Sequence, residues 1–70
     1  MQDKQVVRQE LINKRVAMGL TQKNVAIEAG IERSSYTAIE RGLRKPSLKV
    51  AQKICNVLKM SVDEAFPNED

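Results

Sequence analysis

The sequence predicts an all-α protein, a compact arrangement of five short helices in one domain over residues 1–70. Three observations predict this. Apolar residues recur every three or four positions along most of the chain, and no segment alternates with a period of two residues. Serine, threonine, glycine and proline stand at intervals that suit helix ends. The length of 70 residues is that of a single small domain.

The first helix is expected over residues 4–18. Val7, Leu11 and Val16 recur there at roughly helical spacing, with lysine and arginine between them. Gly19 follows and ends the helix. We therefore expect these three apolar residues to face the core.

The second helix is expected over residues 22–29, with Val25 and Ala26 facing inward. Thr21 is a suitable N-cap, because its hydroxyl can accept a hydrogen bond from a backbone N–H one turn later. Asn24 stands where a capping box has Glu or Gln, so the box is expected to be incomplete. Gly30 suits the left-handed conformation that often ends a helix.

The third helix is expected over residues 33–41, and Gly42 closes it. At about 100° per residue, one side carries Tyr36, Ile39, Glu40 and Leu43. The opposite side carries Ser34, Thr37, Ala38 and Arg41, and Arg33 lies at the N-terminal end. A face of small, hydrogen-bonding side chains between two arginines can approach another surface closely.

Two further helices are expected after the linker "LRKPS". Ser47 is the expected N-cap of the fourth helix, whose apolar stripe is Leu48, Ala51, Ile54, Cys55 and Leu58. Ser61 can cap a short fifth helix with Val62, Ala65 and Phe66. Pro67 ends that helix, and residues 67–70 are expected to form a flexible acidic tail.

Charge is distributed unevenly along the chain. Residues 31–49 contain five basic and two acidic side chains, whereas residues 50–70 contain two basic and four acidic ones. A local basic excess suggests a polyanionic partner, although a solvated surface alone can reach the same charge.

Composition excludes several kinds of site. Cys55 is the single cysteine and the chain has no histidine, so the sequence supports neither a disulfide scaffold nor a zinc site. Cys55 lies on an apolar stripe and is expected to be a core residue. We find no catalytic constellation, and we expect no enzyme activity, cofactor or small-molecule ligand. With no apolar membrane span and a polar N-terminus, a cytoplasmic location is expected.

The chain resembles the helix-turn-helix domain of the Cro and phage-repressor family, also called the XRE family, from about Val7 to Phe66. The matching elements are Arg15 four residues before Gly19, Leu20-Thr21-Gln22, Ala26, Gly30, Ile39-Glu40, Gly42 and Pro46-Ser47. The resemblance implies a five-helix domain with a helix-turn-helix over about residues 21–41. Its third helix would enter the major groove of double-stranded DNA.

The resemblance also implies contact roles for individual residues. Those expected at base edges are Arg33, Ser34, Thr37 and Ala38, with Arg33 reading guanine. Those expected at phosphates are Gln22, Lys23, Arg41, Arg44 and Lys45. Alternatives stay open: Thr37 and Ala38 either touch thymine methyls or are merely small exposed residues, and the cations could simply form a solubilising surface.

This chain departs from the family pattern at some positions. Ser34 and Ala38 stand where better-known members often carry glutamine, and Glu32 stands where a capping Ser, Thr or Asp is usual. Tyr36 replaces the more usual Ile or Val, and its hydroxyl needs a partner or an opening to solvent.

Two structural roles complete the prediction. The resemblance implies that Arg15 and Glu40 form a partly buried ion pair. Apolar residues near the end of the chain are candidates for an isologous homodimer interface or, alternatively, for a cap over the first helix: Val57, Met60, Val62 and Phe66.

Two functions fit these observations. The first is a repressor-like regulator that binds an inverted-repeat DNA operator as a homodimer. The second is a protein-interaction or antitoxin-like module that keeps this fold without reading DNA sequence, because fold alone does not define function.

Overall fold

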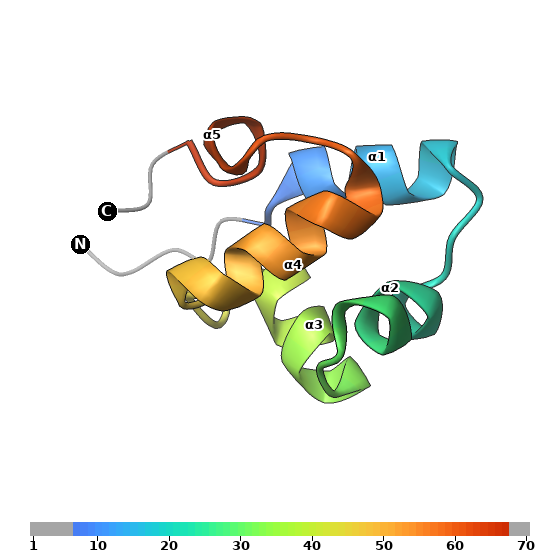
Figure 1. Ribbon diagram of the computed structural model, residues 1–70, viewed down its shortest axis with the longest axis horizontal. Coiled ribbons are helices and arrows are strands. Elements are labelled where there is room, and N and C mark those ends of the chain that lie inside the picture. The colour runs from blue at the N-terminus through green and yellow to red at the C-terminus, as the bar shows by residue number, and fades with distance from the viewer. Residues whose placement is uncertain (1–6, 68–70) are drawn as a thin grey trace.

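Residues 7–67 are described by the computed structural model, and they form helices connected by short turns and loops (Figure 1). In chain order the helices are α1 (Gln9–Ala17), α2 (Gln22–Ala29), α3 (Arg33–Glu40), α4 (Leu48–Leu58) and α5 (Val62–Ala65). The all-α prediction with five helices is therefore confirmed for this part of the chain. None of these helices is long and apolar enough to cross a membrane.

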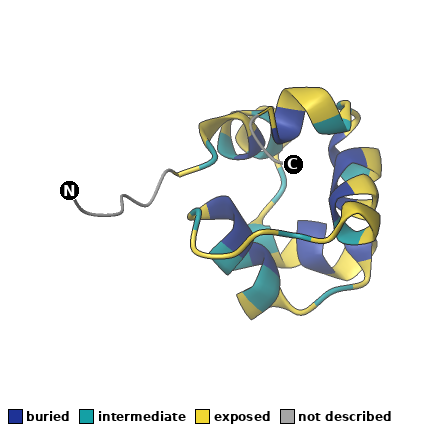
Figure 2. Ribbon diagram, turned by 90° about the vertical axis from the view of Figure 1, so that its left-hand side faces the viewer, coloured by how far each residue is buried: buried dark blue, intermediate teal, exposed yellow. Residues whose placement is uncertain are grey.

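The core lies where the helices face one another. Helix α2 packs against α3 and α4, and α4 also contacts α1 and α5. Figure 2 shows the buried residues on the inner sides of the helices. The buried apolar residues are Leu11, Val25, Ala26, Ala29, Tyr36, Ile39, Ala51, Ile54, Cys55, Leu58, Ala65 and Phe66.

Helix α1 differs from its prediction. It begins at Gln9, and the part of the predicted helix over residues 4–6 lies outside the described residues. Of its predicted inner residues only Leu11 is buried, because Val7 is 45% exposed and Val16 is 61% exposed. Val16 follows Leu11 by five positions, which turns it away from the core. Arg15 follows by four positions and shares the side of Leu11.

Helix α4 begins as predicted. The Ser47 hydroxyl accepts a hydrogen bond from the N–H of Val50 at 3.2 Å, so Ser47 is the N-cap. The stripe Ala51, Ile54, Cys55 and Leu58 is buried, but Leu48 is 66% exposed and was wrongly assigned to it. Leu48 lies in the first turn, at the edge of the stripe.

The start of α2 is capped more completely than predicted. The Asn24 N–H donates to the Thr21 hydroxyl at 3.0 Å, and the Thr21 N–H donates to the Asn24 side-chain oxygen at 3.1 Å. The capping box is therefore complete, and the prediction of an incomplete box was wrong. Asparagine is short, but its carbonyl reaches the N-cap N–H. This reciprocal pair fixes where α2, and with it Gln22, begins.

The end of α3 turns Leu43 outward, contrary to prediction. Gly42 has φ +79°, and the N–H of Leu43 donates to the Ala38 carbonyl at 2.9 Å. This hydrogen-bond pattern is a Schellman motif, which reverses the chain after the helix. Leu43 is consequently 52% exposed beside the outer face of α3 rather than buried with Tyr36 and Ile39.

Residue 32 allows a prediction about stability. Glu32 has the extended N-cap conformation (φ −73°, ψ 147°), but its side chain makes no capping hydrogen bond. Aspartate has a side chain of the length found at N-caps and keeps the charge. Glu32→Asp should therefore raise the free energy of unfolding by about 0.5–1 kcal/mol, measured by urea denaturation. Ser47→Ala, which removes an existing cap, should lower it by a similar amount. An unchanged midpoint for Glu32→Asp would contradict the prediction.

The C-terminal residues divide between core and surface. Phe66 is 4% exposed and lies under the Arg8 guanidinium, which is 5.3 Å from the ring centroid. Its assignment as an interface candidate is corrected, because its side chain is already covered within one chain. Val57, Met60 and Val62 are only partly buried against the core. Of the predicted acidic tail, residues 68–70 lie outside the described residues.

Candidate nucleic-acid interface

The outer face of α3 forms one side of an open concavity of about 480 Å³. Its lining includes all four residues predicted to contact bases, two predicted phosphate contacts and one residue that was not predicted to lie there. These residues are Arg33, Ser34, Thr37, Ala38, Gln22, Arg41 and Leu43. The first turn of α2 thus contributes Gln22 to the same surface as α3.

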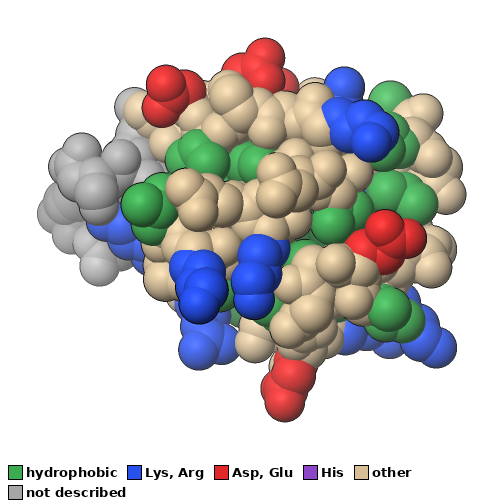
Figure 3. Space-filling model, viewed as in Figure 1, with side chains coloured by type: hydrophobic (Ala, Val, Ile, Leu, Met, Phe, Trp, Pro, Cys, Tyr) green, Lys and Arg blue, Asp and Glu red, His purple; other side chains and the backbone are tan. Residues whose placement is uncertain are grey.

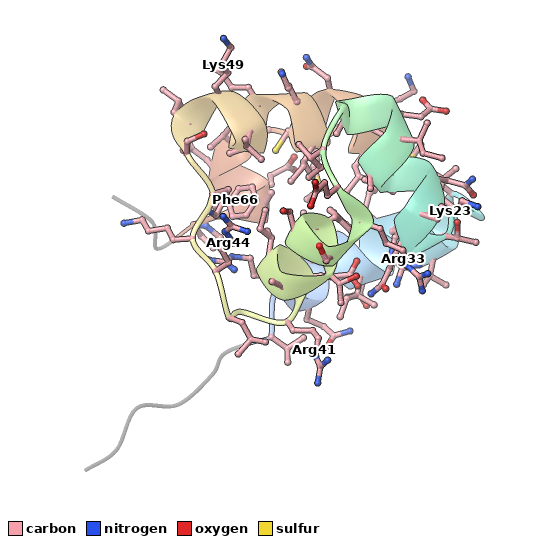
Figure 4. The ribbon with its side chains drawn as sticks, turned by 90° about the horizontal axis from the view of Figure 1, so that it is seen from below. Lys23, Arg33, Arg41, Arg44, Lys49 and Phe66 are labelled. Carbon is pink, nitrogen blue, oxygen red and sulfur yellow. The ribbon has the colours of Figure 1, made fainter. Side chains whose placement is uncertain are left out.

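Three other predicted phosphate contacts lie outside this lining. Lys23 is exposed in the first turn of α2, and Arg44 and Lys45 are exposed in the loop after α3. In Figure 4, Lys23 and Arg33 project on one side of the molecule and Arg41 projects at the lower end of the view. Lys49 points away from them, from the far side of α4. Cations therefore flank the concavity along more than one edge.

Burial makes the surface of residues 31–49 more positive than the sequence count suggests. All five cations of this segment are exposed, whereas Glu40 is buried. Glu32 is therefore the single exposed acidic side chain in the segment. Figure 3 shows most of the lysine and arginine on its face over the lower half of the molecule, where α2, α3 and the start of α4 lie. Acidic side chains lie at the upper edge, near α5, and also at the right and the bottom of this view.

Hydrogen bonds to the buried Glu40 side chain hold α1, α2 and α3 together beneath this surface. The Glu40 carboxylate accepts from Arg15 Nε at 2.7 Å and Nη2 at 3.2 Å, so the expected ion pair is present. It also accepts from the Tyr36 hydroxyl at 2.7 Å and from Gln22 Nε2 at 2.7 Å. The Tyr36 hydroxyl thus has its partner inside the protein. Three helices are tied to one carboxylate.

These contacts shift the pKa values of both acidic groups. Burial disfavours the charged form of Glu40, but hydrogen bonds from Arg15, Gln22 and Tyr36 outweigh it and lower the pKa of Glu40 below its ordinary value. Burial, together with the hydrogen bond to Glu40, raises the pKa of the Tyr36 hydroxyl well above its ordinary value. At neutral pH Glu40 is therefore an ionised acceptor and Tyr36 a neutral donor.

The lowered pKa of Glu40 predicts a dependence of stability on pH. This carboxyl binds a proton less readily in the folded protein than in the unfolded chain. Its contribution to the free energy of unfolding is therefore present above the ordinary glutamate pKa of about 4.3 and is lost as the pH falls below that value. The free energy of unfolding should be measured in urea from pH 7 down to pH 3. The difference between wild type and Glu40→Gln should shrink as the pH falls. A difference that stays constant over this range would contradict the assignment.

The end of α3 and the loop after it are held by Arg8, the N-cap residue of α1. Arg8 Nη1 donates to the Ile39 carbonyl at 2.6 Å and to the Arg44 carbonyl at 3.0 Å. The Arg44 side chain donates in turn to the Ser35 hydroxyl at 3.2 Å. Arg44 therefore projects from a restrained backbone next to α3, which suits a residue that fixes the protein on a polyanion.

Two features of this surface were not predicted from the sequence. Leu43 adds an apolar group beside Ala38, and the signal for it was Gly42, whose left-handed conformation turns the following residue outward. The hydrogen bond from the Thr37 hydroxyl to Gln22 Oε1, at 3.1 Å, was also missed. No pattern within either helix indicates it, because it joins two helices.

Comparisons with known proteins agree with this geometry. A helix-turn-helix family model matches residues 11–64. The chain is similar to the HTH-type transcriptional regulator YqaE of Bacillus subtilis (strain 168), with 44% identity over 50 residues that cover 71% of this chain and 43% of the relative. It is similar to the cryptic phage CTXphi transcriptional repressor RstR of Vibrio cholerae, with 36% identity over 58 residues that cover 83% of this chain and 52% of the relative. The chain thus spans about half the length of these two relatives.

This chain is also similar to a solved structure, over most of the length of both proteins. It is the crystal structure of the restriction-modification controller protein C.AhdI from Aeromonas hydrophila. The TM-score is 0.77 at 36% sequence identity, and the match covers 83% of this chain and 88% of that one.

Proposed function

Because the chain belongs to the helix-turn-helix family of the Cro and phage-repressor type, we propose that it is a sequence-specific, repressor-like transcriptional regulator of double-stranded DNA. The observation that carries this proposal is the outer face of α3. Its four candidate base-reading side chains line one open concavity that is flanked by exposed cations. A relative named as a transcriptional repressor and a structural neighbour named as a controller protein support it.

In the proposed complex, α3 lies in the major groove. Arg33 reads a guanine through its O6 and N7 acceptors, while Ser34, Thr37 and Ala38 face neighbouring base edges. Phosphate contacts fix the register without reading sequence, and they come from Gln22, Lys23, Arg41, Arg44 and Lys45. Leu43 is positioned to exclude water beside Ala38.

A homodimer is part of the proposal. Val57, Met60 and Val62 keep exposed apolar surface near the start of α5, and an isologous contact through them would pair two identical DNA-binding faces. Two copies of α3 about 34 Å apart match one turn of B-DNA, so the operator should be an inverted repeat with half-site centres about 10 base pairs apart or a multiple of that.

Sedimentation at micromolar concentration should show a dimer. Met60→Glu should be monomeric with unchanged helix content. Monomer alone in the wild type, with and without DNA, would contradict the dimer.

Selection of bound sites from a random duplex pool tests the function. The expected result is an inverted repeat that wild type binds at least about tenfold more tightly than a scrambled duplex, with both duplexes measured at the same salt concentration. A preference below tenfold would contradict sequence-specific regulation and favour a protein-interaction module.

A further inference from the structure

The Thr37 hydroxyl on the DNA-facing surface is part of a hydrogen-bond chain that reaches into the core. Thr37 Oγ1 lies 3.1 Å from Gln22 Oε1, and Gln22 Nε2 lies 2.7 Å from Glu40 Oε1. Glu40 is 1% exposed, whereas Thr37 is partly exposed and lines the concavity. The chain therefore links a buried charge to a side chain at the surface.

The charge of Glu40 gives every bond in this chain a direction. An ionised carboxylate only accepts hydrogen bonds, so Gln22 must present its amino group to Glu40. The opposite amide orientation would place a carbonyl oxygen against a carboxylate oxygen at 2.7 Å. Gln22 consequently presents its carbonyl oxygen to Thr37, and a carbonyl oxygen can only accept a hydrogen bond. The single hydroxyl proton of Thr37 is therefore donated to Gln22.

A hydroxyl that has donated its proton keeps only its capacity to accept. In the major groove, the base groups that donate are the N6 amino group of adenine and the N4 amino group of cytosine. We infer that Thr37 determines specificity by accepting a hydrogen bond from an exocyclic amino group of adenine or cytosine at one base pair of each half-site. This inference rests on the proposed function and adds the chemistry that one position of the operator must present.

Ser34 provides an internal contrast. It lines the same concavity, and within residues 7–67 its hydroxyl has no hydrogen bond to the protein. It can therefore rotate to donate or accept. Ser34 should tolerate a base donor or a base acceptor, whereas Thr37 should require a donor.

The test removes amino groups from the selected duplex one at a time. Each adenine is replaced in turn by a purine without the amino group, and each cytosine by a pyrimidinone without it. At one position of each half-site wild type should bind about three- to tenfold more weakly, the range expected for a single hydrogen bond. Whether the sensitive position is an adenine or a cytosine identifies the base.

Three variants assign that loss to Thr37. Thr37→Val removes the hydroxyl at nearly constant shape and should bind the native and the amino-free duplex equally well. Thr37→Ser keeps the hydroxyl and should retain the penalty, as should Ser34→Ala. Circular dichroism and urea denaturation establish that each variant is folded.

Specific outcomes would overturn the inference. One is a Thr37→Val protein that keeps the full penalty. Another outcome comes from a second set of duplexes, in which a base acceptor such as purine N7 is removed. If Thr37→Val suppresses the loss of binding only in that set, Thr37 is the donor. If wild type prefers no duplex over a scrambled one, the proposed function fails and the inference with it. Specific binding without any Thr37-dependent amino group overturns the inference alone.

Discussion

Glu40→Gln is expected to lower the free energy of unfolding by about 3–5 kcal/mol, because it leaves the Arg15 guanidinium partly buried without its counter-charge. The Glu40 side chain is 2% exposed and that of Arg15 is 14% exposed, so water cannot replace the lost interaction fully. A chain of this length has a total stability of roughly 4–10 kcal/mol. The variant should therefore be marginally stable, and its urea denaturation is best measured at low temperature.

A double-mutant cycle separates the ion pair from other effects of substitution. Arg15→Met removes the other partner, and the double variant should lose much less than the sum of the two single losses. Glu28→Gln is the matched control, since Glu28 is exposed on α2, and it should change stability by less than about 0.5 kcal/mol. A Glu40→Gln protein with the wild-type midpoint would show that the pair contributes little to the fold.

Arg33→Ala is expected to weaken binding to the selected operator by about 1–3 kcal/mol and to relax the preference at one base pair. Arg33 is exposed at the first position of α3 and lines the concavity, so its loss removes a base contact without leaving a gap in the core. Binding is measured for the selected site, for single-base changes within it and for a scrambled duplex. Guanine should stop being preferred at that position alone.

Arg44→Ala is the matched control, because it removes a cation of the same kind from the neighbouring loop. It should weaken binding to all duplexes about equally and reduce the salt dependence by about one phosphate contact. If Arg33→Ala behaves in this way too, Arg33 contacts phosphate rather than a base. Since Ser34 and Ala38 are poor direct readers, we expect further specificity from DNA shape at uncontacted steps.

The sequence alone was sufficient to predict much of the fold and of the candidate site. Thr21, Ser47 and Ser61 predicted three helix starts correctly, because a cap is a contact between residues three positions apart. Helical periodicity likewise separated the buried Tyr36 and Ile39 from the outer face of α3. Such features depend on neighbours along the chain, so they can be read before the fold is known.

Other features were decided only by tertiary packing. Helical spacing from Leu11 places Arg15 on the inner side of α1, but only the fold brings Glu40, 25 positions later, to the guanidinium as the partner that makes it stable there. Phe66 is buried rather than free for an interface, because Arg8 covers its ring.

The direction of the Thr37 hydrogen bond belongs to this second group. Thr37 and Gln22 lie on different helices, and the orientation of their side chains follows from the charge of Glu40 beneath them. The sequence by itself determined that α3 has an outer face of small polar residues between arginines. Only the tertiary structure decided what that face can donate or accept, because hydrogen bonds between helices are made by residues far apart in the chain.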